Sequence, residues 1–233
     1  MKKLYIFDFD GVVADTGADI ASSVQAAQRH FGTTVMTKTE ILKYVGYGAD
    51  YLIKNTVAGD ALYGADVRPQ HDGFTDEALR WYKSYYSEHC VEKSVLYDGV
   101  KETLGMIKER NDISCVLTNK PEAVTLRSLE IFGIRDYFFH VLCPENLTKG
   151  KPSPEGIFKC MEVTGAAAEY TVMIGDSAAD IDAGNAAGVH TCGVLSGIGD
   201  RELMLKSKPE ICIDNRHELV IKCDAIFGKI WRA

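Results

Sequence analysis

Near its N-terminus the chain carries the segment Leu4-Tyr5-Ile6-Phe7-Asp8-Phe9-Asp10-Gly11-Val12-Val13-Ala14-Asp15-Thr16. Leu4–Phe7 is a short apolar run, which is typical of a buried parallel strand. Asp8 and Asp10 follow this strand, and side chains two positions apart on a strand share a face. Both carboxylates can therefore reach one small volume. Because ligands in open α/β sheets bind beyond the carboxyl ends of strands, the segment predicts a binding site there.

The two aspartates also admit a simpler explanation. Asp and Gly are common turn residues, so the segment after the strand can be a solvated turn. Two close carboxylates repel each other, however, and a metal ion or a shared proton is the usual compensation. Polar residues elsewhere in the chain distinguish between these two hypotheses.

The composition indicates a globular protein in a reducing compartment. The chain has 233 residues and is 46% hydrophobic, enough for one large core or a core with a smaller second domain. Its net charge of −7 argues against nucleic acid as a main partner. Seven cysteines without a CxxC pair indicate buried thiols rather than disulfides or a zinc site. We expect a cytoplasmic protein without a signal peptide or membrane segment, present as a monomer or homodimer.

Residues 17 to about 92 are predicted to be helical throughout. Apolar residues recur there at helical spacing, as at Ile20, Val24, Ala27 and Phe31. The predicted helices cover residues 19–31, 39–45, 50–57 and 75–90. Between the last two, residues 59–74 contain glycines, a proline and charges, and predict a loop or an irregular insertion.

From residue 97 onward, strand patterns alternate with helix patterns. The predicted strands are residues 113–118, 138–143, 171–175, 190–195 and 210–213, and the predicted helices are 100–108, 121–132, 153–164 and 178–187. This alternation predicts an α/β fold with a Rossmann-like, doubly wound parallel sheet. We expect a core domain of residues 1–15 and 94–233, with a helical domain of residues 16–93 inserted after the first strand.

A second pair of acids follows the predicted strand at residues 171–175. Asp176 lies at the tip of this strand, and Asp180 follows about one helical turn later. These two acids can face the same space as Asp8 and Asp10, and four converging carboxylates are very costly without a cation. Mg²⁺ fits best, because it binds through few carboxylates together with substrate phosphate and water. Helix N-terminal charges are the simpler explanation for Asp176 and Asp180.

Two further segments carry groups that suit a phosphate. Thr118 and Asn119 follow the predicted strand at 113–118, and Lys151 precedes the predicted helix at 153–164. A lysine can supply the positive charge that a phosphate requires. Taken singly, Thr118–Asn119 suits a helix cap and Lys151 a solvated loop, but coincidence explains the whole set poorly.

The sequence resembles the haloacid dehalogenase-like (HAD) phosphohydrolase superfamily over nearly its whole length. The motifs of that superfamily are similar, in the same order, to Asp8-Phe9-Asp10-Gly11-Val12-Val13, Thr118-Asn119, Lys151-Pro152-Ser153-Pro154 and Gly175-Asp176-Ser177-Ala178-Ala179-Asp180. The inserted helical domain looks like the α-helical cap of that superfamily. Within it, Tyr44–Ala49 and Thr118-Asn119-Lys120-Pro121 resemble the phosphoglycolate phosphatase group.

The resemblance implies an Mg²⁺-dependent phosphatase that hydrolyses a small, phosphoglycolate-like phosphomonoester. Asp8 is then the nucleophile that forms an aspartyl-phosphate, and Asp10 the general acid and base. Asp8, the backbone carbonyl of Asp10, and Asp176 would hold the metal ion. Asp180 would hold a metal-bound water or orient Lys151.

The same resemblance assigns the groups that bind the substrate. Thr118 and Lys151 would hold the phosphate oxygens, helped by backbone N–H groups at Gly11 and near Asn119. The loop Gly46-Tyr47-Gly48 in the cap is our first choice for contact with the rest of the substrate, although a helix C-terminal turn explains it equally well. Tyr82, Tyr85 and Tyr86 are predicted to pack inside the cap, and Trp231 to dock the last helix.

Other functions are compatible with the same motifs. A phosphomutase of the β-phosphoglucomutase type has a similar first motif, but the resemblance implies a histidine early in its cap, where this chain has Gly17-Ala18-Asp19-Ile20. A pyrophosphatase or nucleotidase would share the same scaffold. A catalytically inactive binding protein is the least favoured hypothesis, because all the acids and Lys151 are present.

Overall fold

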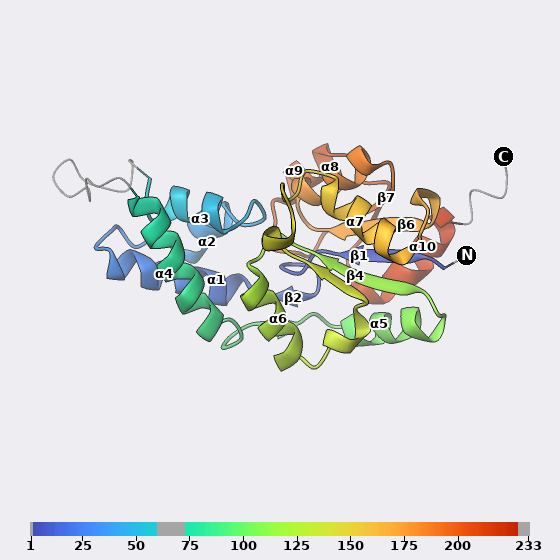
Figure 1. Ribbon diagram of the computed structural model, residues 1–233, viewed down its shortest axis with the longest axis horizontal. Coiled ribbons are helices and arrows are strands. Elements are labelled where there is room, and N and C mark those ends of the chain that lie inside the picture. The colour runs from blue at the N-terminus through green and yellow to red at the C-terminus, as the bar shows by residue number, and fades with distance from the viewer. Residues whose placement is uncertain (1, 60–72, 228–233) are drawn as a thin grey trace.

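A computed structural model describes residues 2–59 and 73–227 of the chain (Figure 1). The irregular insertion predicted at 59–74 falls almost wholly outside these residues, as does the docking position predicted for Trp231. In the described part of the chain, no helix combines the length and the apolar character that crossing a membrane requires.

The centre of the fold is a six-stranded parallel sheet. Its order is β5-β4-β1-β6-β7-β8. The strands are β1 (Leu4–Phe7), β4 (Ile113–Leu117), β5 (His140–Leu142), β6 (Thr171–Gly175), β7 (His190–Val194) and β8 (Ile211–Ile213). Strand β1 lies between β4 and β6, and the chain proceeds outward from it in both directions. The predicted doubly wound α/β fold is confirmed, and β1 stands where its two halves meet.

Helices cover both faces of this sheet, which explains why β1 is apolar at every position. Tyr5 and Phe7 pack on one face, in a cluster with residues from α5 (Val100–Glu109), α6 (Glu122–Ile131) and α10 (Leu219–Phe227). Leu4 and Ile6 pack on the other face with α7 (Glu155–Thr164) and α8 (Ala178–Ala187). All four side chains of β1 are buried, as a strand between two helical layers requires.

The proposed cap, residues 16–93, has four helices among its described residues, and most of their buried apolar side chains form one cluster. The helices are α1 (Gly17–His30), α2 (Lys38–Leu42), α3 (Ala49–Thr56) and α4 (Phe74–Glu88). In Figure 1 they lie together beyond one end of the sheet. The cap cluster joins residues such as Val24, Ile53 and Tyr82, and it also includes Val124 of α6, a helix that contributes Leu129 to a cluster of the sheet. All its other fully buried members lie in the helical insertion, as the proposed division at residues 15/16 and 93/94 predicts.

A two-stranded antiparallel ribbon, which was not predicted from the sequence, joins the cap to the core. Ala14–Asp15 (β2) pairs with Val95–Leu96 (β3) where the chain leaves and re-enters the core. Beside it, the carboxylate of Asp19 accepts hydrogen bonds from the backbone N–H groups of residues 92, 93 and 94. Strands of two residues are too short to show alternating hydrophobicity, so the sequence does not predict them.

Several element boundaries differ from those predicted. The first helix begins at Gly17 instead of residue 19, because the carbonyl of Thr16 accepts the N–H groups of Asp19 and Ile20. Helix α4 begins at Phe74 after Gly73, one residue before the start predicted at residue 75. Helix α9 (Arg201–Lys206) was not predicted, and short 3-10 turns occur at Arg135–Tyr137, Pro144–Asn146, Ala168–Tyr170 and Arg216–Glu218.

Candidate active site

The segment after β1 turns sharply against β6 and the loop that follows β7. The N–H of Asp8 donates to the carbonyl of Ile174, which extends the pairing with β6 by one residue. Gly11 then adopts a φ of 79°, and a Cβ atom there would lie only 1.8 Å from Oδ2 of Asp176. The turn therefore requires glycine at this position for two reasons, backbone conformation and space.

Three carboxylates meet below this turn. Oxygens of Asp8, Asp176 and Asp180 lie within 4.8 Å of one another, and all three residues are buried. Oδ2 of Asp176 accepts the N–H groups of Ile198 (2.7 Å) and Gly199 (2.8 Å). Oδ2 of Asp180 accepts the N–H (3.0 Å) and hydroxyl (2.6 Å) of Ser177, so the first turn of α8 holds this carboxylate in place. Buried oxygen ligands at this spacing suit a hard divalent cation.

Burial and mutual repulsion make these acids hard to ionise without a cation. Burial raises the pKa of Asp8 to about 6, with Asp180 and Asp10 adding to the rise and Lys151 opposing it. Burial also raises the pKa of Asp176 to about 8, assisted by the charges of Asp180 and Asp8 and opposed by its two backbone hydrogen bonds. The site therefore carries repulsion between like charges that a bound cation would relieve.

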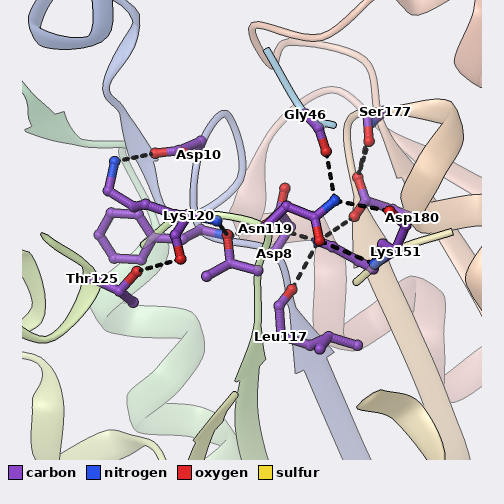
Figure 2. A network of polar contacts seen from close by, with 12 residues as sticks. Asp8, Asp10, Gly46, Leu117, Asn119, Lys120, Thr125, Lys151, Ser177 and Asp180 are labelled. Carbon is purple, nitrogen blue, oxygen red and sulfur yellow. Dashed lines mark hydrogen bonds and ion pairs between the residues drawn. The ribbon is translucent and has the colours of Figure 1, made fainter. Parts of the chain in front are cut away.

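Lys151 is the buried counter-charge of this cluster. Its ammonium lies 2.6 Å from Oδ1 of Asp180 and 2.9 Å from Oδ1 of Asp8, and it donates to the carbonyl of Leu117 at 2.8 Å (Figure 2). Burial alone lowers the pKa of Lys151, but the two carboxylates outweigh it and raise the pKa overall. Three oxygens occupy three N–H donors, so Lys151 acts here first as a partner of the acids.

Thr118 and Asn119 lie directly after β4, at the same edge of the sheet. The Thr118 hydroxyl is buried and accepts the N–H of Lys120 at 3.3 Å. The side-chain N–H₂ of Asn119 donates to the carbonyls of Gly46 (2.8 Å) and Lys151 (2.9 Å), and its Oδ1 accepts the N–H of Lys151 (3.0 Å). Asn119 thus connects the Lys151 loop to the cap loop (Figure 2).

Asp10 stands apart from the three clustered acids. Its Oδ1 accepts the hydroxyl of Thr16 at 2.7 Å and the ammonium of Lys120 at 2.8 Å. The carboxylate of Asp10 does not belong to the group of three, so its predicted place at a metal ion rests on its backbone carbonyl.

Lys120 and Arg216 make contacts at the site that the sequence did not predict. Lys120 lies within Thr118-Asn119-Lys120-Pro121, so its position directly after Asn119 could have indicated that it lies near the site. Arg216 donates to the backbone carbonyls of Gly11 (2.6 Å) and Val12 (3.0 Å) and so supports the turn after β1. Arg216 lies some 200 residues from that turn in the sequence, and no local sequence pattern indicates that the two are in contact.

A pocket separates the cap from these core residues. Its core wall includes Asp8, Asp10, Thr118, Asn119, Lys120 and Asp176, and its cap wall includes Ile20, Val45, Gly46, Gly48, Ala49, Leu52, Tyr82 and Tyr86. Tyr82 and Tyr86 do pack inside the cap as predicted, but they also face this pocket. Tyr47 does not line this pocket but lines an adjoining one, together with Asn119 and Lys151; the residue is 41% exposed, and its ring lies near that of Tyr51.

Comparison with known proteins places this geometry in a family. Residues 5–194 match the family model of the haloacid dehalogenase-like hydrolases. The chain is 31% identical over 219 residues to the phosphoglycolate phosphatase of Photobacterium profundum, covering 94% of both proteins. It is 30% identical over 220 residues to that of Colwellia psychrerythraea, covering 94% of this chain and 96% of the relative.

A solved structure has the same fold. The crystal structure of a predicted phosphoglycolate phosphatase from Haemophilus somnus superimposes with a TM-score of 0.88 at 28% identity, over 95% of this chain and 97% of that one. The buried acids, Lys151 and the inserted helices thus occur in a chain that these relatives match from end to end. The chain belongs to the haloacid dehalogenase-like hydrolase family and is an enzyme similar to the phosphoglycolate phosphatases.

Proposed function

We propose that the enzyme hydrolyses a small phosphomonoester similar to phosphoglycolate, through an aspartyl-phosphate on Asp8 and with Mg²⁺ bound. The observation that carries the proposal is the position of Asp8. This buried carboxylate lies at the end of β1, faces the pocket, and contacts Lys151 beside two further acids. The names of the relatives support phosphoglycolate as the substrate class.

The donor set fits Mg²⁺. Three buried carboxylates have only one ammonium, Lys151, within salt-bridge distance among the described residues, so the group holds an excess of negative charge that a divalent cation balances. Asp8, Asp176 and the backbone carbonyl of Asp10 would hold the ion, with Asp180 positioned beside them. When bound, Mg²⁺ supplies positive charge that reduces the repulsion between Asp8 and the substrate phosphate.

The first chemical step is attack by Asp8. Its Oδ1 is fixed by the N–H of Phe9 (2.7 Å) and by Lys151 (2.9 Å), which orients the carboxylate toward the pocket. A carboxylate oxygen of Asp8 forms a bond to phosphorus as the bond to the leaving oxygen breaks. Asp10 donates a proton to the leaving oxygen, and the Thr118 hydroxyl would hold a non-bridging phosphate oxygen.

The second step returns Asp8 to its starting state. Asp10, now ionised, removes a proton from a water molecule, and the water oxygen attacks phosphorus. The bond between phosphorus and Asp8 breaks, and inorganic phosphate leaves. The apolar side chains of the cap wall would keep other water molecules away from the intermediate.

A panel of phosphorylated metabolites, assayed with Mg²⁺, tests the proposal. We expect the highest kcat/KM for short phosphomonoesters, free phosphate as the product, and loss of turnover in Asp8→Asn with an unchanged circular dichroism spectrum. Undiminished hydrolysis by Asp8→Asn would contradict the mechanism. Release of an isomerised phosphate ester would favour a phosphomutase, and a preference for pyrophosphate or nucleotides would favour a pyrophosphatase or a nucleotidase.

A further inference from the structure

Lys120 is a buried lysine that the mechanism above does not use. Its side chain is 1% exposed, and it is the one cation among the described residues that line the pocket. Burying an ammonium is costly unless it meets well-placed partners. Among the described residues, its polar partners are the carboxylate of Asp10 and the hydroxyl of Tyr86. The first belongs to the core and the second to the cap.

We infer that Lys120 is a positioning residue, which fixes the carboxylate of Asp10 for proton transfer and is itself held by Tyr86 of the cap. The inference rests on the proposed function, because it assumes that Asp10 is the acid and base.

The geometry at Asp10 separates its two oxygens. Oδ1 accepts both the ammonium of Lys120 (2.8 Å) and the hydroxyl of Thr16 (2.7 Å). Within residues 2–59 and 73–227, no hydrogen-bond donor reaches Oδ2. Two donors on one oxygen fix the plane of the carboxyl group, and the other oxygen stays available to give or take a proton. Figure 2 shows Lys120 approaching Asp10 from the side away from Lys151.

Tyr86 fixes the lysine in turn. The ammonium of Lys120 is hydrogen-bonded to the Tyr86 hydroxyl and lies 4.4 Å from the centre of the same ring. It also lies 5.6 Å from the centre of the Phe9 ring, and Phe9 is the residue between the two aspartates in the sequence. Such placement over aromatic faces stabilises a cation away from water. Because Tyr86 is on α4, the cap takes part in holding Asp10 through Lys120.

A rival role for Lys120 is contact with a carboxylate of the substrate. Its ammonium has three N–H donors and two polar partners, so one donor remains for a ligand. The two roles differ in which kinetic constant they affect. A substrate contact affects KM for substrates that carry a carboxylate, whereas a positioned acid affects kcat for every substrate with a poor leaving group.

The leaving group provides the decisive experiment. An alkoxide needs a proton as it departs, whereas p-nitrophenolate is a weak base that departs without one. The holoenzyme and its Lys120→Met, Lys120→Arg and Tyr86→Phe variants would be assayed with phosphoglycolate, ethyl phosphate and p-nitrophenyl phosphate. Stopped-flow measurements separate the first turnover of p-nitrophenyl phosphate from the later ones.

For Lys120→Met we expect kcat on both alkyl phosphates to fall about ten- to hundredfold, which is at or below the lower end of what general acid catalysis contributes, because Asp10 itself is retained. The first turnover of p-nitrophenyl phosphate should stay within about threefold of wild type, and a burst of roughly one nitrophenolate per enzyme should precede slow turnover. The burst arises because water attack on the intermediate still needs Asp10. Lys120→Arg should restore part of the loss.

Tyr86→Phe keeps the ring and tests the chain of contacts if Lys120→Met fails to fold. It should show the same pattern with a smaller loss, whereas Tyr85→Phe should be unchanged. Tyr85 lies next along α4 and stacks on Trp81 and His89 instead. An equal loss with p-nitrophenyl phosphate in the first turnover, or a rise in KM for phosphoglycolate alone, would overturn the inference. A wild-type enzyme that hydrolyses none of the three would instead overturn the proposed function.

Discussion

The two walls of the pocket use polar groups in different ways. On the core wall, the side chains of Asp8, Asp10 and Asp176 each have fixed hydrogen-bonding or ionic partners. On the cap wall, the lining side chains are largely apolar, with Ile20, Val45, Ala49, Leu52 and Tyr82 among them. Replacing one member of a buried charge network leaves its partner without a counter-charge. Replacing one apolar side chain by another of similar size lowers the free energy of unfolding only moderately. We infer that the core wall sets the chemistry and that the cap wall can vary with the substrate.

The largest expected effect comes from removing the buried ammonium of Lys151, which contacts Asp8 of the core wall. Lys151→Met leaves Asp8 and Asp180 without the charge that lies 2.9 and 2.6 Å from them. We expect the free energy of unfolding of the metal-free protein to fall by about 3–5 kcal/mol, with loss of turnover. Urea denaturation followed by circular dichroism measures the change.

Lys159 offers a matched control on the neighbouring helix α7. It pairs with Glu155 at 3.1 Å, but its side chain is 41% exposed. Lys159→Met should therefore cost less than about 1 kcal/mol. Similar costs for the two lysines would contradict the idea that the core wall depends on mutual charge compensation.

A second prediction concerns pH and metal binding. The pKa of Asp176 is raised to about 8 and that of Asp8 to about 6, so the folded, metal-free protein holds protons that the unfolded chain releases near pH 4. The stability contributed by these two acids is fully present below about pH 4 and is lost as the pH rises through 6 and 8. Mg²⁺ must displace these protons, so its affinity should fall by up to about tenfold per pH unit between pH 8 and pH 6, and by up to about a hundredfold per unit below pH 6, where both acids hold a proton.

Titration calorimetry with Mg²⁺ in buffers of different ionisation enthalpy measures the protons released. We expect net proton release at pH 7 and much less at pH 9. Asp176→Asn should remove most of that release and raise the stability of the metal-free protein at pH 9. Metal binding without proton release at pH 7 would show that the carboxylates are ionised before the ion arrives.

The turn after β1 gives a third, smaller effect. In Gly11→Ala a methyl group would overlap Oδ2 of Asp176 and the backbone would keep a φ of 79°. Gly32 in the cap has a similar φ of 69°, with no atom within 4 Å of an added Cβ. Gly32→Ala should cost about 1–2 kcal/mol for backbone conformation alone, and Gly11→Ala about 1–3 kcal/mol more for overpacking. Thermal unfolding of both variants measures the difference, and equal costs would show that the turn has room to shift.

The core wall was predictable from sequence because its parts are local. Strand β1, the two aspartates after it and the acids around Asp176 each belong to a short segment with a recognisable pattern. The parallel sheet then brings these segments to one edge, since every strand points the same way. Thr118 and Lys151 lie at the same edge for the same reason.

The contacts between the walls were not predictable in this way. Lys120 meets Tyr86 across 34 positions of the sequence, and Asn119 meets Gly46 across 73. No periodicity or spacing in the sequence predicts that these residues are in contact. The pairing of the short strands β2 and β3, which lies where the cap is attached, is equally hard to predict from sequence. Long-range pairings of this kind depend on how the two domains pack.

A substitution in the cap loop Gly46-Tyr47-Gly48 should have the smallest effect on stability and activity. It tests directly whether the cap wall is less sensitive to substitution than the core wall. The sequence predicted that the loop Gly46-Tyr47-Gly48 contacts the substrate. Gly46 and Gly48 line the pocket, whereas Tyr47 is 41% exposed, lies near Tyr51 and lines the adjoining pocket with Asn119 and Lys151. We expect Tyr47→Ala to change the free energy of unfolding by less than about 0.5 kcal/mol and kcat/KM by less than about threefold. Leu52→Ala, which alters a buried side chain of the cap wall, should change both more strongly. A loss of kcat/KM in Tyr47→Ala of about tenfold or more would show that this ring reaches the substrate during the reaction, and that the cap loop contributes more than backbone to the pocket.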